Sequence, residues 1–400
     1  MKPSQKTCLT KMQKVMVKLA DYYLQAFIFK GGIMREKLQD IISKIENVDS
    51  KAAKEAQDYC VSLLKIPGSL GRIEDLAVQL SSITGKTKNN LDKKCIIMMS
   101  ADNGIVAQNV SSAPQSVTVT MTECFSKMVT GVGVFARAAN AKLYVYDIGV
   151  NGDINDKAVI NKKIMRGTND FSLGPAMSEE AALKAIFTGI EAVKTAIDDG
   201  YEVIGTGEMG IGNTSTSTAV ICALSGAKVK DCVGSGTGMV NDEAMQNKID
   251  VINRGLTINK PNPDDPVDVL AKVGGLDIAA LCGVFIGCAY YKVPAVIDGY
   301  ISSAAAYAAF KLCPKVRGYM IESHITEEVG YKVVKEQLNL KPMFDLNMRL
   351  GEGSGCPFTF FAIDCANSMM NNMYTFEQGM ISEEYTDTVS YTHLIRLTLW

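Results

Sequence analysis

The spacing of apolar residues divides the chain into a helical beginning, a long middle part in which strands and helices alternate, and a helical end. Between Arg35 and Leu64 apolar side chains recur at helical intervals with a break near Asp49, which predicts two helices. Pro67-Gly68 predicts a turn, and a further helix starts near Leu76. These helices are expected to form one block.

After residue 90 the pattern changes to short apolar runs that end in small polar residues, each followed by a helical pattern. Six runs predict strands: Cys95–Met99, Leu143–Asp147, Glu202–Gly205, Asp231–Val233, Ala295–Ile297 and Gly318–Ile321. Uninterrupted apolar strands that alternate with helices are typical of a parallel sheet covered on both faces. The chain is therefore predicted to be an α/β protein with a Rossmann-like, six-stranded parallel sheet flanked by helices.

One helix of the middle part has both ends marked in the sequence. Ser178 can cap its start, and Gly200 can end it in the left-handed conformation. Six apolar residues between them predict one buried face: Leu183, Ile186, Phe187, Ile190, Val193 and Ile197.

The two chain ends are predicted to contribute to one small domain. An apolar helical pattern over Phe358 to Met373 can pack against the first helices. This gives a small helical domain of residues 34–90 plus 345–386 and a large α/β substrate-binding domain of residues 91–344. Residues 1–33 and 387–400 fit neither domain, and we treat both as extensions that need not be native.

The composition is that of a globular protein, with 47% hydrophobic and 21% charged residues in a chain of 400. A formal net charge of -2 gives no general attraction to nucleic acid or to an anionic membrane, so we expect neither as a partner. The eleven cysteines include no C-x-x-C pair, which indicates a reduced, cytoplasmic setting. With two histidines in the chain, a histidine-based metal site is not expected.

Polar and glycine-rich segments follow the predicted strands. Ligands of open parallel sheets bind beyond the carboxyl ends of the strands, where such segments meet. The segments are Ser100 to Gly104, Asp147 to Gly149, Gly205 to Ser215, Gly234 to Gly238, Asp298-Gly299 and Glu322 to His324.

Glu352 stands among three glycines in the segment Leu350 to Pro357. Because glycines carry no side chain, backbone and ligand can approach this carboxylate closely. The segment is either a solvated turn or a device that aims one acid or base at a bound molecule.

The segment Gly205 to Gly210 matches G-x-G-x-x-G and follows a predicted strand, so a nicotinamide dinucleotide site has to be considered. Glu208 argues against it, because a carboxylate would stand inside the loop that should hold a pyrophosphate. The next predicted strand also ends in Gly234-Ser235-Gly236, where an acid that binds ribose would be expected.

An anion site is the second candidate. The hydroxyl-rich run Asn213 to Thr218 exceeds what capping of a helix needs and suits hydrogen bonds to sugar or carboxylate oxygens. The loop Gly234 to Gly238 offers backbone amides to an anion, and Lys248 can add a charge, although a plain strand-to-helix turn is the alternative.

Asp298 is either a turn acid or a ligand contact, and His324 is more typical of a structural histidine. Together these parts describe a phosphorylated-sugar site with one isolated Glu, which suits displacement at a sugar carbon by a weakly acidic nitrogen.

From about Met34 to Tyr385 the chain resembles the nicotinate-nucleotide–dimethylbenzimidazole phosphoribosyltransferase family. The motifs that carry the resemblance are Pro67 to Arg72, Ala101 to Gly104, Gly207 to Thr214, Lys272 to Gly275, Asp298-Gly299 and Arg349 to Gly355. The resemblance implies transfer of phosphoribose from nicotinate mononucleotide to dimethylbenzimidazole, which gives alpha-ribazole phosphate and nicotinate in cobamide assembly. It also implies a homodimer that needs no metal or other cofactor.

For the site, the resemblance makes Glu352 the general base, and Glu208 and Asp298 are candidates to stabilise positive charge at the sugar carbon. The expected nucleotide and phosphate contacts are Gly210, Asn213, Thr214, Gly234, Gly236, Lys248 and Ser323. The expected pocket for the acceptor base is made by Asp102, Ala113, Met121 and Leu350.

Three positions depart from the family's usual residues. Asn103 replaces a His, Ala113 replaces a hydroxyl residue before Pro114, and Met121 replaces a Gln. A more apolar pocket follows, and we predict that it tolerates several acceptor bases. A nicotinamide-dinucleotide-dependent oxidoreductase and a non-catalytic nucleotide-binding relative remain the alternatives.

Overall fold

The computed structural model describes residues 32–236 and 241–381. The predicted extension 387–400, nearly all of the extension 1–33, and Thr237 and Gly238 of the predicted anion loop lie outside these residues. The chain divides into two compact units, Met1–Lys44 and Ile45–Trp400. In the first unit residues 32–43 form a helix. All of the following concerns the second unit.

The second unit contains a parallel sheet of six strands in the order β3-β2-β1-β4-β5-β6. The strands are β1 Lys94–Ala101, β2 Lys142–Gly149, β3 Ile160–Asn161, β4 Val203–Met209, β5 Ala295–Ile297 and β6 Met320–Glu322. Every residue of β1 and β4 is buried, as expected of strands covered on both faces. The predicted fold class is confirmed.

One predicted strand is wrong. The segment Asp231–Val233 is not extended, because the chain forms a 3-10 turn, η2 (Val229–Asp231), in which the amide of Cys232 bonds back to Val229. The sixth place in the sheet belongs instead to β3, which pairs with Tyr146 and Asp147 of β2. A strand of two residues carries too little pattern to be recognised in a sequence.

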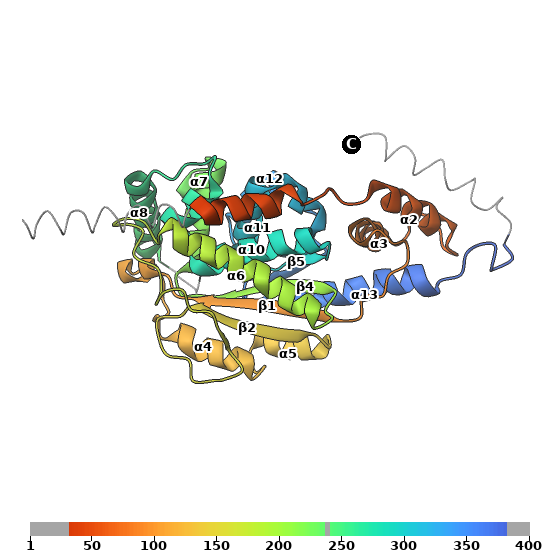
Figure 1. The fold of residues 1–400 in the computed structure, drawn as a ribbon, viewed down its shortest axis with the longest axis horizontal. Helices are drawn as coiled ribbons and strands as arrows, with labels where there is room; N and C mark the ends of the chain where they lie inside the picture. The colour runs from red at the N-terminus through yellow and green to blue at the C-terminus, as the bar shows by residue number, and fades with distance from the viewer. Residues whose placement is uncertain (1–31, 237–240, 382–400) are drawn as a thin grey trace, which may run out of the picture. The chain divides into compact units, whose positions relative to one another are not determined.

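Helices cover both faces of the sheet (Figure 1). On one face α4 (Val117–Ser126) and α5 (Gly131–Ala138) contact β2. On the other, α6 (Glu179–Asp198), α10 (Leu276–Tyr291) and α11 (Tyr300–Leu312) contact β1 or β4. The other helices and 3-10 turns in this part of the sequence are η1 Gly104–Gln108, α7 Asn213–Ser225, α8 Asp242–Asn259, α9 Pro266–Val273, η3 Pro314–Tyr319 and α12 Tyr331–Gln337. Within the described residues, none of the helices is long and apolar enough to span a membrane.

The ends predicted for α6 are confirmed. The Ser178 side chain accepts a hydrogen bond from the amide of Ala181 at the start of the helix. Gly200, just beyond its last turn, has a φ of +87°, a left-handed conformation that favours glycine. Local capping chemistry was therefore sufficient to place this helix.

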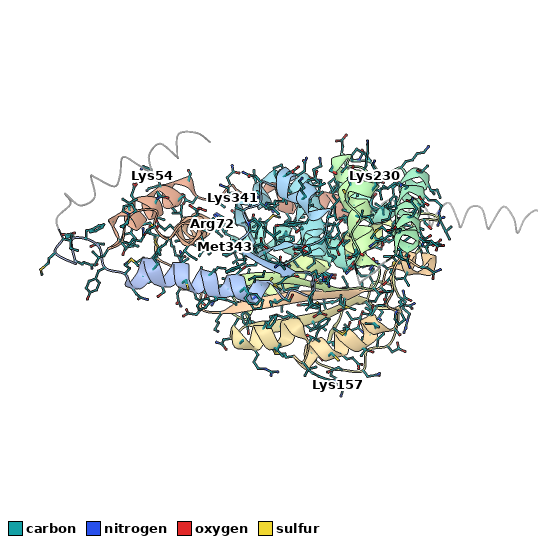
Figure 2. All side chains as sticks on the ribbon, turned by 180° about the vertical axis from the view of Figure 1, so that it is seen from behind. Lys54, Arg72, Lys157, Lys230, Lys341 and Met343 are labelled. Carbon is teal, nitrogen blue, oxygen red and sulfur yellow. The ribbon has the colours of Figure 1, made fainter. Side chains whose placement is uncertain are left out.

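Helices from both parts of the sequence pack together beside the sheet. Helix α3 (Arg72–Thr84) contacts α2 (Ser50–Ser62) and α13 (Cys356–Asn372). The Arg72 guanidinium also donates to the carbonyl of Lys341 over 2.8 Å, and these two residues lie beside Met343 in Figure 2. The division into a small helical and a large α/β domain stays a prediction.

The C-terminal part assigned to the small helical domain begins with a strand that was not predicted. Phe344–Met348 form a strand, β8, which pairs in parallel with β7 (His324–Thr326) in a second, two-stranded sheet. Strand β8 runs directly into the Glu352 loop, so the second sheet fixes where that loop begins.

Candidate active site

A cavity of about 350 Å³ opens at the carboxyl end of β4. Nine of the predicted site residues line it: Ala113, Met121, Glu208, Gly210, Asn213, Thr214, Gly236, Leu350 and Glu352. They come from α4, β4, α7, the turn that joins β4 to α7, and three loops that are distant in sequence. The clustering at the strand ends is what a parallel sheet predicts for a ligand site.

The Glu352 backbone has an unusual conformation. Its φ is +62°, and the flanking Gly351 and Gly353 have φ values of +78° and +83°. Three successive positive φ values form a sharp bend, which is uncommon for a residue with a Cβ. A Cβ at Gly353 would stand 3.1 Å from the Thr206 carbonyl oxygen, so the bend lies directly on β4.

The bend is held by a buried carboxylate. Asp298 Oδ2 accepts from the amide of Gly353 over 2.9 Å, and its Oδ1 accepts from the amide of Gly355 over 2.7 Å. Asp298 is 2% exposed and does not line the cavity. Because both oxygens bind the loop backbone, the geometry favours a positioning role over contact with the sugar.

The Glu352 carboxyl group faces the cavity with one oxygen free. The side chain is largely buried, and Oε2 has no hydrogen-bond partner. Burial, followed by the negative charge of Asp298, raises the pKa of Glu352 to about 7, while a hydrogen bond from the Val132 amide opposes the shift. A carboxyl group with such a pKa and an unsatisfied oxygen suits proton transfer near neutral pH.

Two further buried carboxyl groups, those of Glu208 and Asp277, are joined to each other through Asn213. Asn213 Nδ2 donates to Glu208 Oε2 and, over 3.2 Å, to Asp277 Oδ2, and Glu208 Oε1 accepts from the amide of Glu352 over 3.3 Å. Burial, followed by the charge of Asp277, raises the pKa of Glu208 to about 8. Burial raises the pKa of Asp277 to about 7. The sequence interpretation missed Asp277, although it follows Gly274-Gly275 of a family motif.

The G-x-G-x-x-G segment is not a phosphate loop. Gly205 and Gly207 lie inside β4. A Cβ at Gly205 would stand 2.9 Å from the Sγ of Cys356, and a Cβ at Gly207 would stand 2.9 Å from the carbonyl oxygen of Glu352. A Cβ at Gly210 would stand 2.1 Å from the Ala101 carbonyl oxygen. At these glycines the missing side chain makes room for other parts of the protein and not for a phosphate group. The motif is therefore no evidence for a dinucleotide site.

The polar end of the cavity contains the predicted anion groups. Lys248 is buried behind the cavity wall, and its Nζ donates to Thr214 Oγ1 over 3.0 Å and to the Gly234 carbonyl over 3.1 Å. Burial lowers the pKa of Lys248 to about 8. Gly236 lines the cavity, and its amide is bound by Glu328, a residue that the sequence interpretation missed. Further lining residues that it missed include Tyr300, Thr326 and Arg349.

The apolar end of the cavity is lined by Ala113, Met121 and Leu350, to which the structure adds Val117. The structure does not place Asp102 there. Its side chain is buried and accepts from the amide of Asn151 over 2.7 Å.

Ser323 also lies away from the cavity. Its Oγ donates to the Asp298 carbonyl over 2.9 Å and pairs with His324 Nδ1 over 2.8 Å. Among the described residues, no group of three or more His, Cys, Asp or Glu side chains could hold a metal ion.

In this parallel α/β fold, anion-binding groups, apolar residues and the carboxyl group of Glu352 line one cavity, which is the arrangement expected of a transferase that acts on a phosphorylated sugar. The comparisons agree with this class. A phosphoribosyltransferase family model, DBI_PRT, matches residues 45–381.

The chain is 47% identical to nicotinate-nucleotide–dimethylbenzimidazole phosphoribosyltransferase of Clostridium perfringens over 352 residues, which cover 88% of this chain and 97% of the relative. It is 40% identical to the protein of that name from Halalkalibacterium halodurans, and the match covers 88% of this chain and 98% of the relative. A crystal structure of the Thermus thermophilus protein of that name matches with a TM-score of 0.79 and 32% identity, covering 84% of this chain and 99% of that one. The chain belongs to the nicotinate-nucleotide–dimethylbenzimidazole phosphoribosyltransferase family.

Proposed function

We propose that the protein transfers phosphoribose from nicotinate mononucleotide to dimethylbenzimidazole or a related base in cobamide nucleotide-loop assembly. The products are alpha-ribazole phosphate and nicotinate. The observation that carries the proposal is that Glu352, whose buried Oε2 has no hydrogen-bond partner, lines the same cavity as the apolar residues and the anion-binding groups. Relatives that match over most of their length carry the name of this enzyme.

In the proposed reaction a ring nitrogen of the base forms a bond to the anomeric carbon as the bond to the nicotinate nitrogen breaks. Attack comes from the side opposite nicotinate, so the configuration inverts. Glu352 takes the ring proton of the incoming base. Asp298 acts through the loop that it binds, because its oxygens already accept from Gly353 and Gly355.

We propose that Glu208 stabilises the positive charge that develops on the sugar through the dipole of its carboxyl group, because a pKa of about 8 keeps this group mostly neutral near pH 7. Its carboxyl group lines the cavity and receives hydrogen bonds from Asn213 and from the amide of Glu352. The phosphate would lie at the other end, against Gly236, Thr214 and the charge of Lys248.

We further propose that the enzyme works in the cytoplasm as a homodimer. All ten cysteines among the described residues are free thiols, which is typical of a reducing compartment. An aromatic cluster of Phe135, Phe358 and Phe361 is partly exposed, with Phe361 at 69%, and is the surface that we expect a second copy to cover. Light scattering of Phe361→Glu would show a monomer; a dimer would contradict this choice of surface.

The reaction itself is tested by incubating the protein with nicotinate mononucleotide and dimethylbenzimidazole and separating the products by chromatography. We expect nicotinate and alpha-ribazole phosphate in equal amounts. Binding of nicotinate mononucleotide without any product would favour a non-catalytic relative. Absorbance changes with a nicotinamide dinucleotide, and none with the mononucleotide, would favour an oxidoreductase.

A further inference from the structure

The anion end of the cavity already contains a negative side chain, that of Glu328 in the loop between β7 and α12. Its Oε1 accepts a hydrogen bond from the amide of Gly236 over 3.1 Å. A Cβ at Gly234 would stand 1.8 Å from Glu328 Oε2, so the carboxylate lies directly against the glycine loop. The absence of a side chain at Gly234 is what makes room for it.

The groups around Glu328 are those that bind an anion. A Cβ at Gly236 would stand 3.3 Å from Lys248 Nζ, so the ammonium group lies just behind the same glycine. The charge of Glu328 acts on that ammonium group and raises its pKa, against the larger effect of burial. Among the described residues, no carboxylate forms an ion pair with Lys248. Glu328 thus places a carboxylate against the cradle formed by Gly234, Gly236 and Lys248.

The second oxygen of this carboxylate is unsatisfied. Glu328 Oε2 is buried without a hydrogen-bond partner, and Glu328 lines the cavity. A buried acceptor without a donor is unfavourable, so the contact with the cradle is one that a better acceptor can replace. A phosphate oxygen would accept from the same amide, and two anions at that distance repel each other strongly.

We propose that Glu328 is a built-in competitor for the phosphate group, occupying the cradle in the free enzyme and moving away when the nucleotide binds. This inference rests on the proposed function, because it takes the ligand to be a nucleoside monophosphate. Substrate and product both carry the phosphate, so the competition weakens the binding of both. Glu328 thereby favours product release and leaves the chemical step unchanged.

The test measures dissociation constants by calorimetry for three ligands: inorganic phosphate, nicotinate mononucleotide and nicotinate riboside. Glu328→Gln should bind the two phosphate-containing ligands about tenfold more tightly, because the cradle is no longer occupied by an anion. The riboside, which lacks the phosphate, should bind as it does to the unchanged protein. Glu327→Gln removes the same charge from the exposed neighbouring residue and should change none of the three constants.

Unchanged or weaker phosphate binding by Glu328→Gln would overturn the proposal. Equal weakening of the mononucleotide and the riboside would also overturn it and make Glu328 a ribose ligand. Glu328→Asp, which shortens the side chain, should show a smaller gain in phosphate affinity, and thermal unfolding checks that both variants are folded. Phosphate binding can be measured without turnover, so the two proposals fail separately. Absence of phosphoribose transfer would contradict the proposed function alone. Normal transfer, together with unchanged phosphate affinity in Glu328→Gln, would contradict the role of Glu328 alone.

Discussion

The amide of Gly353 donates a hydrogen bond to Asp298 Oδ2 over 2.9 Å, which ties the residue after Glu352 to the end of β5. Asp298 lies 55 residues away in sequence from Gly353. The position of Glu352, the proposed general base, therefore depends on a carboxylate that does not line the cavity.

The first prediction concerns this contact. Asp298→Asn replaces one acceptor with a donor facing a backbone amide, so the loop should shift and kcat should fall about a hundredfold. The free energy of unfolding should decrease by about 1–3 kcal/mol. In the Glu352→Gln background the same change should have little further effect on kcat, because Asp298 acts through Glu352. Additive losses would assign Asp298 a separate catalytic role.

The pH dependence of kcat/KM should report the ionisation of Glu352. The carboxylate form accepts the proton, and its pKa is about 7, so kcat/KM should fall about tenfold per pH unit below that value. Steady-state rates between pH 5 and 9 provide the measurement. The residual activity of Glu352→Gln should show no such acid limb; if the limb persists, another group causes it.

Gly207 provides a test of the packing between β4 and the Glu352 loop. Gly207→Ala would place a Cβ 2.9 Å from the Glu352 carbonyl oxygen and 3.0 Å from Met98, so kcat should fall at least about tenfold. Gly174→Ala is the matched control, because a Cβ there meets no atom within 4 Å. Equal activity of the two variants would mean that the close approach at Gly207 does not position the loop.

The apolar end of the cavity should accept several bases. Competition among dimethylbenzimidazole, adenine and phenol should yield more than one product, since Ala113 and Met121 offer no polar side-chain group to select a ring. Met121→Gln adds such a group and should raise the preference for dimethylbenzimidazole over phenol about tenfold. Met121→Leu should leave it unchanged. Exclusive use of dimethylbenzimidazole by the unchanged protein would contradict a tolerant pocket.

The sequence was informative wherever a local pattern determines structure. Uninterrupted apolar runs placed β1, β2 and β5, and Ser178 with Gly200 placed α6. The two-residue strand β3 has no such pattern, and the apolar residues after η2 were mistaken for a strand.

The candidate site divides in the same way. Glu352 was recognisable because its glycines are adjacent in sequence. The contact of Glu328 with Gly236 joins residues 92 apart, and Asn213 reaches Asp277 across 64 residues. Asp298 was predicted as a site residue, but its contact with the loop backbone becomes visible only in three dimensions.

The most direct measurement is the turnover of Glu352→Gln with nicotinate mononucleotide and dimethylbenzimidazole, followed by chromatography of alpha-ribazole phosphate. Glutamine keeps the size of the side chain but cannot take up the proton. We predict a loss in kcat of about a hundred- to ten-thousandfold with the affinity for nicotinate mononucleotide retained. Normal turnover by this variant would contradict the assignment of Glu352 as the general base.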